Sequence, residues 1–292
     1  IIMNKDEKKL FLKRFKIIRS IGEEVMQDNE LFILLKQKKQ LIVYDGFEPS
    51  GRMHIAQGLL RAINVNKYLE AGCKFKFWIA DWFALINHKL GGDLKKIRKA
   101  GKLMIETWKV CGMDVNNPNI EFIWSSDAIN AEPERYWLKV FDIASKFKIN
   151  NIKKCTQIMG RNDEDDLSTS QLMYPVMQAA DVFFLDVDIC SLGMDQKKVN
   201  MLCREYCNKI HRKHKPIIIS HHMLMGLDGS DKMSKSNPDN AIFMNDAPYN
   251  VKRKIKKAFC EVGNIDINPI LEYVKYIIFE KDDEFIIERE EK

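Results

Sequence analysis

Short apolar runs alternate with amphipathic segments along most of this 292-residue chain, and this alternation limits the folds that it can adopt. The apolar runs, which are rich in β-forming residues, lie at 41–44, 75–80, 120–124, 183–187 and 216–220. The amphipathic segments, which have apolar residues at helical spacing, lie at 53–69, 95–110 and 196–210. Strands that alternate with helices build a parallel sheet with right-handed crossovers. The sequence therefore predicts an α/β fold with a doubly wound, Rossmann-like parallel sheet.

Three regions do not follow this alternation. Residues 1–38 are predicted to form an N-terminal helical extension, because charged and apolar positions follow each other at helical spacing. Residues 127–171 carry helical sequence and an acidic run, which indicates a segment inserted into a Rossmann-like domain at 39–247. After Ala247 the chain is helical and basic. Residues 248–292 are therefore predicted to begin an α-helical C-terminal domain that the sequence leaves incomplete.

Composition limits the class of protein. The chain has 47 basic and 41 acidic side chains, and its net charge of +6 permits a polyanionic partner without requiring one. Its seven cysteines are odd in number and scattered through apolar segments, which is typical of reduced thiols inside the cell. No apolar run approaches the length of a membrane span, and the charged start does not resemble a secretion signal. These features predict a cytoplasmic protein without a membrane partner.

Two polar elements fit a polyphosphate site. The first is the turn 48–51 between a predicted strand and helix, where free amides and the helix dipole attract phosphate. His54 and Gln57 are three residues apart, so both can donate to a phosphate oxygen from one face. The second is the loop 232–236, in a predicted linker at 221–240, which is cationic and rich in donors. Either element alone also fits a structural cap or a solvated loop, and their joint presence favours phosphate binding.

A predicted helix supplies polar groups for a small ligand. Tyr174, Gln178 and Asp181 are four and three residues apart, so they share one helix face. An ordinary amphipathic helix is the alternative. A phenol, an amide and a carboxylate beside apolar neighbours suit a small zwitterion with one further polar end. Asp195 and Gln196, at the start of the next helix, add a carboxylate and an amide.

These elements resemble the signatures of class I aminoacyl-tRNA synthetases. The loop 232–236 matches the KMSKS signature completely, whereas in the HIGH signature Ala56 replaces a glycine and Gln57 replaces the second histidine. Further matching segments lie at 44–51, 80–81, 174–181, 193–196 and 226–229. With them, the resemblance narrows to the tyrosyl-tRNA synthetases of the archaeal and eukaryotic cytoplasmic type.

The resemblance implies residue roles at the matching positions. It implies catalytic roles for His54, Gln57, Lys232 and Lys235. It implies binding of tyrosine by Tyr44, Glu48, Ala80, Tyr174, Gln178, Asp181 and Gln196. It implies binding of ATP by Gly46, Phe47, Ser50, Gly51, Gly193, Asp195, Met233, Ser234 and Ser236, and of tRNA by Lys154 and Lys197.

The same resemblance implies a reaction. The carboxylate of L-tyrosine attacks the α-phosphate of ATP, and the tyrosyl group of the resulting adenylate passes to tRNA(Tyr). The enzyme positions the reactants and stabilises developing charge. ATP with Mg²⁺ enters as a substrate complex, and no permanently bound cofactor is implied. The resemblance also implies a homodimer formed through the inserted segment 127–171, which contacts the tRNA acceptor stem as well.

Three alternatives stay open at this point. The first is a tryptophanyl-tRNA synthetase, which the Tyr44 and Asp181 pair disfavours because a carboxylate placed for a phenol matches indole poorly. The second is a small-molecule adenylyltransferase, which would not need a basic helical extension. The third is a repurposed RNA-binding homologue without activity, which the intact Lys232 and Lys235 disfavour.

One cysteine group suggests a metal site. Cys203, Cys207 and His211 recur at four-residue steps. Thiols at this spacing more often pack into a core. The sequence therefore predicts no bound metal.

Overall fold

The computed structural model describes residues 4–160, 166–233, 237–280, 282 and 284–288. The chain divides into two compact units, each assembled from three separate stretches of sequence. The first unit comprises Ile1–Gly51, Asn66–Met104 and Val115–His222. The second unit comprises Arg52–Val65, Ile105–Asp114 and Met223–Lys292.

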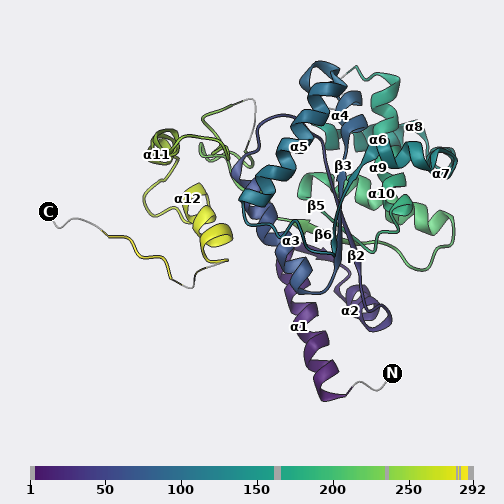
Figure 1. Cartoon of the computed structure of the whole chain (residues 1–292), viewed down its shortest axis with the longest axis horizontal. Coiled ribbons are helices and arrows are strands. Elements are labelled where there is room, and N and C mark those ends of the chain that lie inside the picture. Colours follow the sequence, from purple (N-terminus) through teal and green to yellow (C-terminus); the bar gives the residue numbers. More distant parts are fainter. Residues whose placement is uncertain (1–3, 161–165, 234–236, 281, 283, 289–292) are drawn as a thin grey trace. The chain divides into compact units, whose positions relative to one another are not determined.

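A single sheet forms the centre of the first unit (Figure 1). In the described part of the chain its strands are β1 (Glu24–Met26), β2 (Ile42–Phe47), β3 (Lys74–Ile79), β4 (Ile120–Trp124), β5 (Ile189–Gly193) and β6 (Ile217–His221). Their order is β1-β6-β5-β2-β3-β4, and β1 alone pairs antiparallel to its neighbour. From β2 the chain winds outward through β3 and β4, then returns to build β5 and β6 on the other side. The predicted doubly wound parallel sheet is confirmed, with one difference: β1, which lies in the extension 1–38 that was expected to be helical, adds an antiparallel edge strand.

Helices surround this sheet, and further helices lie in the second unit. Within the first unit they are α1 (Lys5–Ile21), α2 (Asp28–Gln37), α4 (Asp81–Ile86), η2 (Lys89–Gly92), α6 (Ser125–Ala131), α7 (Pro133–Lys146), α8 (Ile149–Cys155), η3 (Thr156–Met159), α9 (Thr169–Phe184), η4 (Met194–Gln196) and α10 (Lys197–Lys209). The second unit holds η1 (Ala56–Leu60), α11 (Pro248–Lys257), α12 (Pro269–Tyr273) and η5 (Val274–Ile278). Two helices have residues in both units, α3 (Arg61–Glu70) and α5 (Leu94–Val110).

Helix α9 is the most deeply buried helix of the first unit and packs against α7, α8 and α10 (Figure 1). It begins at a capping box, in which Ser168 Oγ accepts from the amide of Gln171 and the Gln171 side chain accepts from the amide of Ser168. Twelve of its sixteen residues are buried. Polar side chains on α9 therefore lie within the core, where each needs a partner.

One predicted strand is wrong. The run 183–187 was expected to be a strand, but α9 continues through Phe184 and the strand β5 begins at Ile189. The amides of Leu185 and Val187 close the helix end by donating to the carbonyls of Asp181 and Val182, at 2.8 and 3.0 Å. Periodicity cannot distinguish a short apolar run in a strand from the end of a buried helix.

The segment 127–171 contributes to the core of the first unit. Ile129, Tyr136 and Val140, from α6 and α7, belong to the same buried cluster as Tyr44 and Trp78 of the sheet. In the second unit, α11, α12 and η5 agree with the helical sequence expected after Ala247. The predicted domain limits, 39–247 and 248–292, remain predictions.

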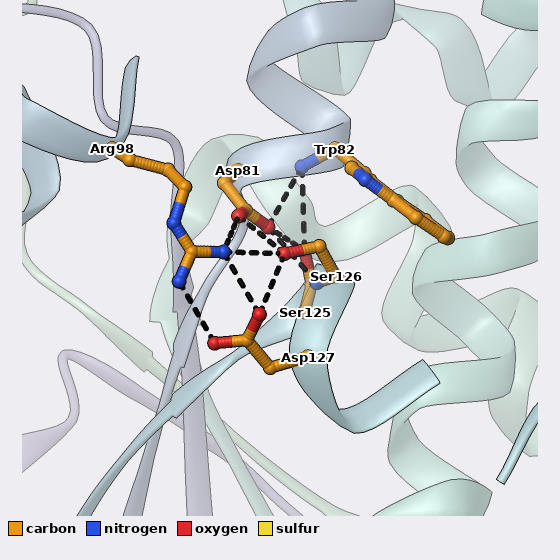
Figure 2. Close-up of polar contacts among 6 residues, drawn as sticks. All are labelled: Asp81, Trp82, Arg98, Ser125, Ser126 and Asp127. Carbon is orange, nitrogen blue, oxygen red and sulfur yellow. Dashed lines mark hydrogen bonds and ion pairs between the residues drawn. The ribbon is translucent and has the colours of Figure 1, made fainter. Parts of the chain in front are cut away.

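A polar network joins the ends of β3 and β4 to α5 (Figure 2). The Asp81 carboxylate is fully buried and accepts from Ser125 Oγ at 2.7 Å and from Ser126 Oγ at 2.6 Å. Arg98 donates to Asp81 at 3.2 Å and forms two bonds to Asp127, at 2.9 and 2.8 Å. The hydrogen bond from Arg98, with its charge, lowers the pKa of Asp127. The network fixes the starts of α4 and α6 at the carboxyl end of the sheet.

Replacing Asp81 tests how much this network contributes to the free energy of unfolding. We expect Asp81→Ala to lower the free energy of unfolding by about 3 kcal/mol, because buried hydroxyl and guanidinium donors lose their acceptor. The measurement is urea-induced unfolding. The matched control is Asp28→Ala, whose ion pair with Arg19 is 42–47% exposed and should contribute less than about 1 kcal/mol. Equal losses in the two variants would contradict a structural role for the network.

Candidate active site

Several predicted site residues of the first unit come directly after β2 and β5. Between these neighbouring strands the order of the sheet changes direction. β2 pairs with both β3 and β5, and ligands of open α/β sheets bind outside the carboxyl ends of strands at such a point. β2 ends at Phe47 and is followed by the turn 48–51. β5 ends at Gly193 and is followed by Asp195 and Gln196 in η4. The topology thus brings both groups to one edge of the sheet.

A buried carboxyl group on α9 belongs to this cluster of predicted site residues. Asp181 is fully buried, and its Oδ1 accepts a hydrogen bond from the Tyr136 hydroxyl at 2.8 Å. Burial raises the pKa of Asp181 well above its usual value, while the hydrogen bond from Tyr136 and the nearby Trp78 indole favour the ionised form. Among the described residues, Oδ2 has no hydrogen-bond partner of ordinary geometry. This second oxygen is therefore a buried acceptor, with the Trp78 indole as a nearby influence on the carboxyl group.

Tyr44 of β2 contributes a hydroxyl to the same cluster. Its side chain is 1% exposed, and burial raises its pKa, with the charge of Asp181 as the next largest cause. A Cβ on Gly46 would lie 2.9 Å from the Tyr44 hydroxyl oxygen, so glycine leaves that hydroxyl room. Tyr44 and Asp181, for which the resemblance implies a joint role, are thus near enough to influence each other, and that role stays a prediction.

Glu48 is the second carboxyl group among the residues predicted to bind the amino acid. Its carboxylate accepts from the Tyr174 hydroxyl at 2.7 Å and from Asn87 Nδ2 at 3.1 Å. The Lys89 ammonium lies 3.6 Å away. Burial, followed by the charge of Glu48, raises the pKa of Tyr174, which therefore stays a neutral donor. A partly buried carboxylate held in this way can receive a ligand ammonium group.

Two amides form the third pair. Gln178 Nε2 donates to Gln196 Oε1 at 3.1 Å, and Gln196 Nε2 donates to the carbonyl of Ile158 at 3.2 Å. Ala80 is 5% exposed, and its amide donates to the carbonyl of Phe47 at 2.8 Å. All seven residues predicted to bind the amino acid belong to the first unit, and six of them form three neighbouring pairs there.

The histidine element lies in the second unit. The predicted helix from Met53 starts later, because η1 begins at Ala56 with a π-helical turn, a rare form that is frequent at functional sites. His54 precedes the helix and forms an isolated antiparallel bridge with Phe243. Its carbonyl accepts from the amide of Gly58 at 3.0 Å. Gln57 belongs to the π-helical turn, and its carbonyl accepts from the Trp108 indole at 2.8 Å.

Close packing holds this element against residues 242–244. The amide of Ile55 donates to the carbonyl of Ile242 at 2.8 Å, and the amide of Met244 donates to the carbonyl of Met53 at 2.9 Å. A Cβ on Gly58 would lie 2.6 Å from Met244 Cγ, so only glycine permits this approach. The histidine element is therefore paired with the segment that follows the lysine loop in sequence.

The base of the lysine loop is closed by a small polar network. Asp228 Oδ1 accepts from Ser230 Oγ at 2.6 Å and from Asn240 Nδ2 at 3.0 Å. The bond from Ser230 is the largest cause that lowers the pKa of Asp228. A Cβ on Gly226 would lie 2.3 Å from Asn240 Nδ2, so the turn requires glycine there. Residues on both sides of the loop are thereby joined.

Only part of the loop itself is described. Lys232 is exposed, whereas Met233 is buried in an apolar cluster with Leu224 and Leu227. Three of the predicted site residues, Ser234, Lys235 and Ser236, lie outside the described residues. Their predicted roles rest on the sequence.

A further ion cluster links the histidine element to the region after the loop. Asp246 is paired with Arg52 and with Lys254, each at 2.6 Å. Both cations lie over the ring of Phe243, at 4.2 and 5.0 Å from its centroid. Lys254 is 5% exposed and also donates to the carbonyl of Ala241 at 2.7 Å. These contacts fix the position of Phe243, the bridge partner of His54.

The two predicted tRNA-binding lysines differ in their surroundings. Lys154, on α8, is exposed. Lys197, at the start of α10, forms an ion pair at 2.8 Å with Glu24 of the short strand β1. Lys197 is therefore tied to the N-terminal extension.

Sequence reasoning missed Tyr136, Asn87 and Asp246. Tyr136 lay in a segment interpreted as an insertion, although Tyr136, Val140 and Ile143 have the four- and three-residue spacing of a buried helix face. Asn87 and Asp246 are in loops or at helix ends, where no periodicity indicates which polar side chain turns inward. Only tertiary contacts identify them.

The cysteine group lies in the core. Cys203 and Cys207 on α10 are 1% and 0% exposed, and burial raises the pKa of both thiols. His211 is exposed beyond the end of this helix. Across the described residues, no three His, Cys, Asp or Glu side chains are grouped so as to hold a metal ion. Nor does any described helix combine the length and apolar character needed to cross a membrane.

Known proteins resemble the chain along most of its length. A family model described as tRNA synthetases class I (W and Y) matches residues 36–291. Tyrosine–tRNA ligase 1, cytoplasmic, of Arabidopsis thaliana is 59% identical over 96% of this chain and 72% of that protein. Tyrosine–tRNA ligase 2, cytoplasmic, of the same plant is 55% identical over 95% of this chain and 37% of that protein. The solved structure of Leishmania major tyrosyl-tRNA synthetase in complex with tyrosinol has a TM-score of 0.88 and 49% identity, covering 97% of this chain and 43% of that chain.

These comparisons agree with the fold and narrow the family. The chain spans less than half the length of the second plant relative and of the Leishmania protein. All three proteins are named for tyrosine, so the tryptophanyl alternative has less support. An archaeal tyrosine–tRNA ligase from Picrophilus torridus is 39% identical over 90% of this chain and 79% of that protein. The chain therefore belongs to the class I tRNA synthetases of the tryptophan and tyrosine family, and within it to the tyrosyl enzymes of the eukaryotic and archaeal type.

Proposed function

We propose that the chain activates L-tyrosine with ATP and transfers the tyrosyl group to tRNA(Tyr). The observation that carries this proposal is the buried Asp181 carboxyl group, whose charge acts on the nearby Tyr44 and whose Oδ2 has no hydrogen-bond partner of ordinary geometry among the described residues. A phenol satisfies this oxygen, whereas an apolar side chain would leave it buried without a partner. The indole of tryptophan could donate to this oxygen only through its N–H group, and its larger ring would have to fit in the space that the phenol ring takes.

The other two pairs of the pocket suit the amino-acid end of the substrate. We assign the ammonium group to Glu48, with Tyr174 beside it, and the carboxylate region to the amides of Gln178 and Gln196. Ala80 lines the pocket. Since each of these side chains already has a hydrogen-bond partner or a close contact, the pocket is ordered before tyrosine binds. The tyrosine carboxylate is thereby aimed at the α-phosphate.

ATP, as its Mg²⁺ complex, is the second substrate. We assign its phosphates to His54, Gln57, Lys232 and Lys235, whose donors and charges stabilise the negative charge that develops during in-line attack. We assign the adenosine to residues at and after the ends of β2 and β5 and on the lysine loop, with Asp195 on the ribose. The residues in this group are Gly46, Phe47, Ser50, Gly51, Gly193, Asp195, Met233, Ser234 and Ser236. No side chain of the protein forms a covalent intermediate in this scheme.

The tRNA and the cellular location complete the proposal. We assign acceptor-stem contacts to Lys154 and Lys197, whose ammonium groups can bind phosphate oxygens or base edges. Because Lys197 is paired with Glu24, tRNA would have to compete for it or bind both residues. The two plant relatives are named as cytoplasmic, and we propose the same location for this chain.

A homodimer is also proposed, formed through α7, α8 and α9. An apolar groove between these helices is lined by residues that include Phe141, Phe147, Ile149 and Met173. Phe141 is 58% exposed and Ile149 is 73% exposed, and exposed apolar groups of this size mark association surfaces. The resemblance to a dimeric family selects a second copy of the chain as the occupant.

The dimer proposal predicts a change of mass. Phe141→Glu should convert the dimer into monomers, because it puts a charge into an apolar interface. Light scattering after size exclusion measures the mass. Leu10→Glu, at a residue 60% exposed on α1, is the control and should leave the dimer intact. A wild-type monomer, or a Phe141→Glu dimer, would contradict the proposal.

Tyrosine-dependent ATP–pyrophosphate exchange tests the proposed activity itself. The wild-type protein should catalyse ATP–pyrophosphate exchange when tyrosine is present. It should not do so with tryptophan or when no amino acid is added. A repurposed RNA-binding homologue would not catalyse the exchange with any amino acid. Lys235→Ala should slow exchange by about a hundredfold or more, because it removes a charge from the developing anion. Lys213→Ala, which removes an exposed lysine of the first unit, is the control and should retain the wild-type rate. Near-normal exchange in Lys235→Ala would refute the assigned role of the loop.

A further inference from the structure

We propose that Tyr136 is the positioning residue for recognition of the substrate hydroxyl. Its hydrogen bond fixes one oxygen of Asp181 and favours the carboxylate form of this group. The other oxygen then accepts a hydrogen bond from the ligand hydroxyl. The inference rests on the proposed tyrosine specificity and deepens it. Tyr136 contacts Oδ1 of Asp181, so it acts on the ligand only through this carboxyl group.

The geometry of Tyr136 supports this role. The residue lies on α7, is fully buried, and donates its hydroxyl to Asp181 Oδ1 at 2.8 Å. The same hydroxyl lies 3.3 Å from the carbonyl of Met177, one turn earlier on α9. The rings of Trp137 and Phe184 contact the Tyr136 ring edge-on, at 5.6 and 5.2 Å between centroids. Ring packing and two acceptors thus fix the donor, and through it the rotation of the carboxylate.

The groups around Asp181 make its ionisation depend on the hydrogen bond from Tyr136. Tyr44 on β2, Tyr136 on α7, Tyr174 on α9 and Cys203 on α10 all interact with Asp181, and burial raises the pKa of each. All four are therefore neutral at neutral pH. Burial also raises the pKa of Asp181, and the bond from Tyr136 is the largest influence that lowers it. Without that donor, the buried group would more readily take up a proton.

Ionisation of Asp181 determines how strongly phenylalanine is rejected. Leaving a buried carboxylate oxygen without a partner costs more free energy than leaving a neutral carboxylic acid without one. A protonated Asp181 could also turn its hydroxyl toward Tyr44 and tolerate an apolar ring. Tyr136 therefore increases selectivity against phenylalanine more than it increases the affinity for tyrosine.

The test compares Tyr136→Phe with the wild-type chain. The ratio of tyrosine to phenylalanine kcat/KM in ATP–pyrophosphate exchange should fall by about tenfold or more, the loss expected for one hydrogen bond to a charged group. The acid limb of the tyrosine pH profile should move to higher pH, because removal of the donor raises the pKa of Asp181. Tyr206→Phe is the matched control: Tyr206 is equally buried in this core, but its hydroxyl donates to Asp142.

Each possible result either supports or overturns the proposed role of Tyr136. A lower selectivity and a shifted acid limb in Tyr136→Phe, with neither change in Tyr206→Phe, would support it. Unchanged selectivity in a folded Tyr136→Phe protein, or equal changes in the two variants, would overturn it. Wild type that does not activate tyrosine would instead refute the proposed function, so the two failures are distinguishable.

Discussion

A carboxyl group buried at the centre of the first unit is the constraint on which the pocket depends. Burial of Asp181 costs free energy unless hydrogen bonds and a ligand satisfy its oxygens. Tyr136 on α7 satisfies one oxygen, and the other is buried without a hydrogen-bond partner of ordinary geometry among the described residues. The capping box, the deep burial of α9 and its packing against α7, α8 and α10 hold the carboxyl group in place. Substrate selectivity follows from this fixed position.

The second unit is organised by backbone pairing and ion clusters. The histidine element pairs with residues 242–244, and Asp246 binds Arg52 and Lys254 on both sides of Phe243. Asp228, Ser230 and Asn240 close the base of the lysine loop. The two signatures are about 180 residues apart in sequence, and segments that flank them are hydrogen-bonded to each other within this unit. Such preorganised donors suit a site that stabilises charge.

The sequence predicted features that repeat and missed those that depend on single contacts. Alternating apolar and amphipathic segments specified the parallel sheet, and helical spacing placed Tyr174, Gln178 and Asp181 on one face. The same periodicity failed at 183–187, where the end of a buried helix looks like a strand. Tyr136 could not be assigned to the pocket, because nothing in its local sequence shows that its hydroxyl reaches Asp181 on another helix. The Lys197–Glu24 pair was missed for the same reason.

The central claim is that the buried Asp181 carboxyl group selects the phenol. Titration calorimetry with tyrosine and with phenylalanine, on wild type and on the isosteric Asp181→Asn variant, tests it most directly. The account predicts a strong wild-type preference for tyrosine that falls at least about tenfold in the variant, because the carboxyl group that accepts from the phenol is replaced by an amide. A folded Asp181→Asn protein that keeps the full preference would contradict it.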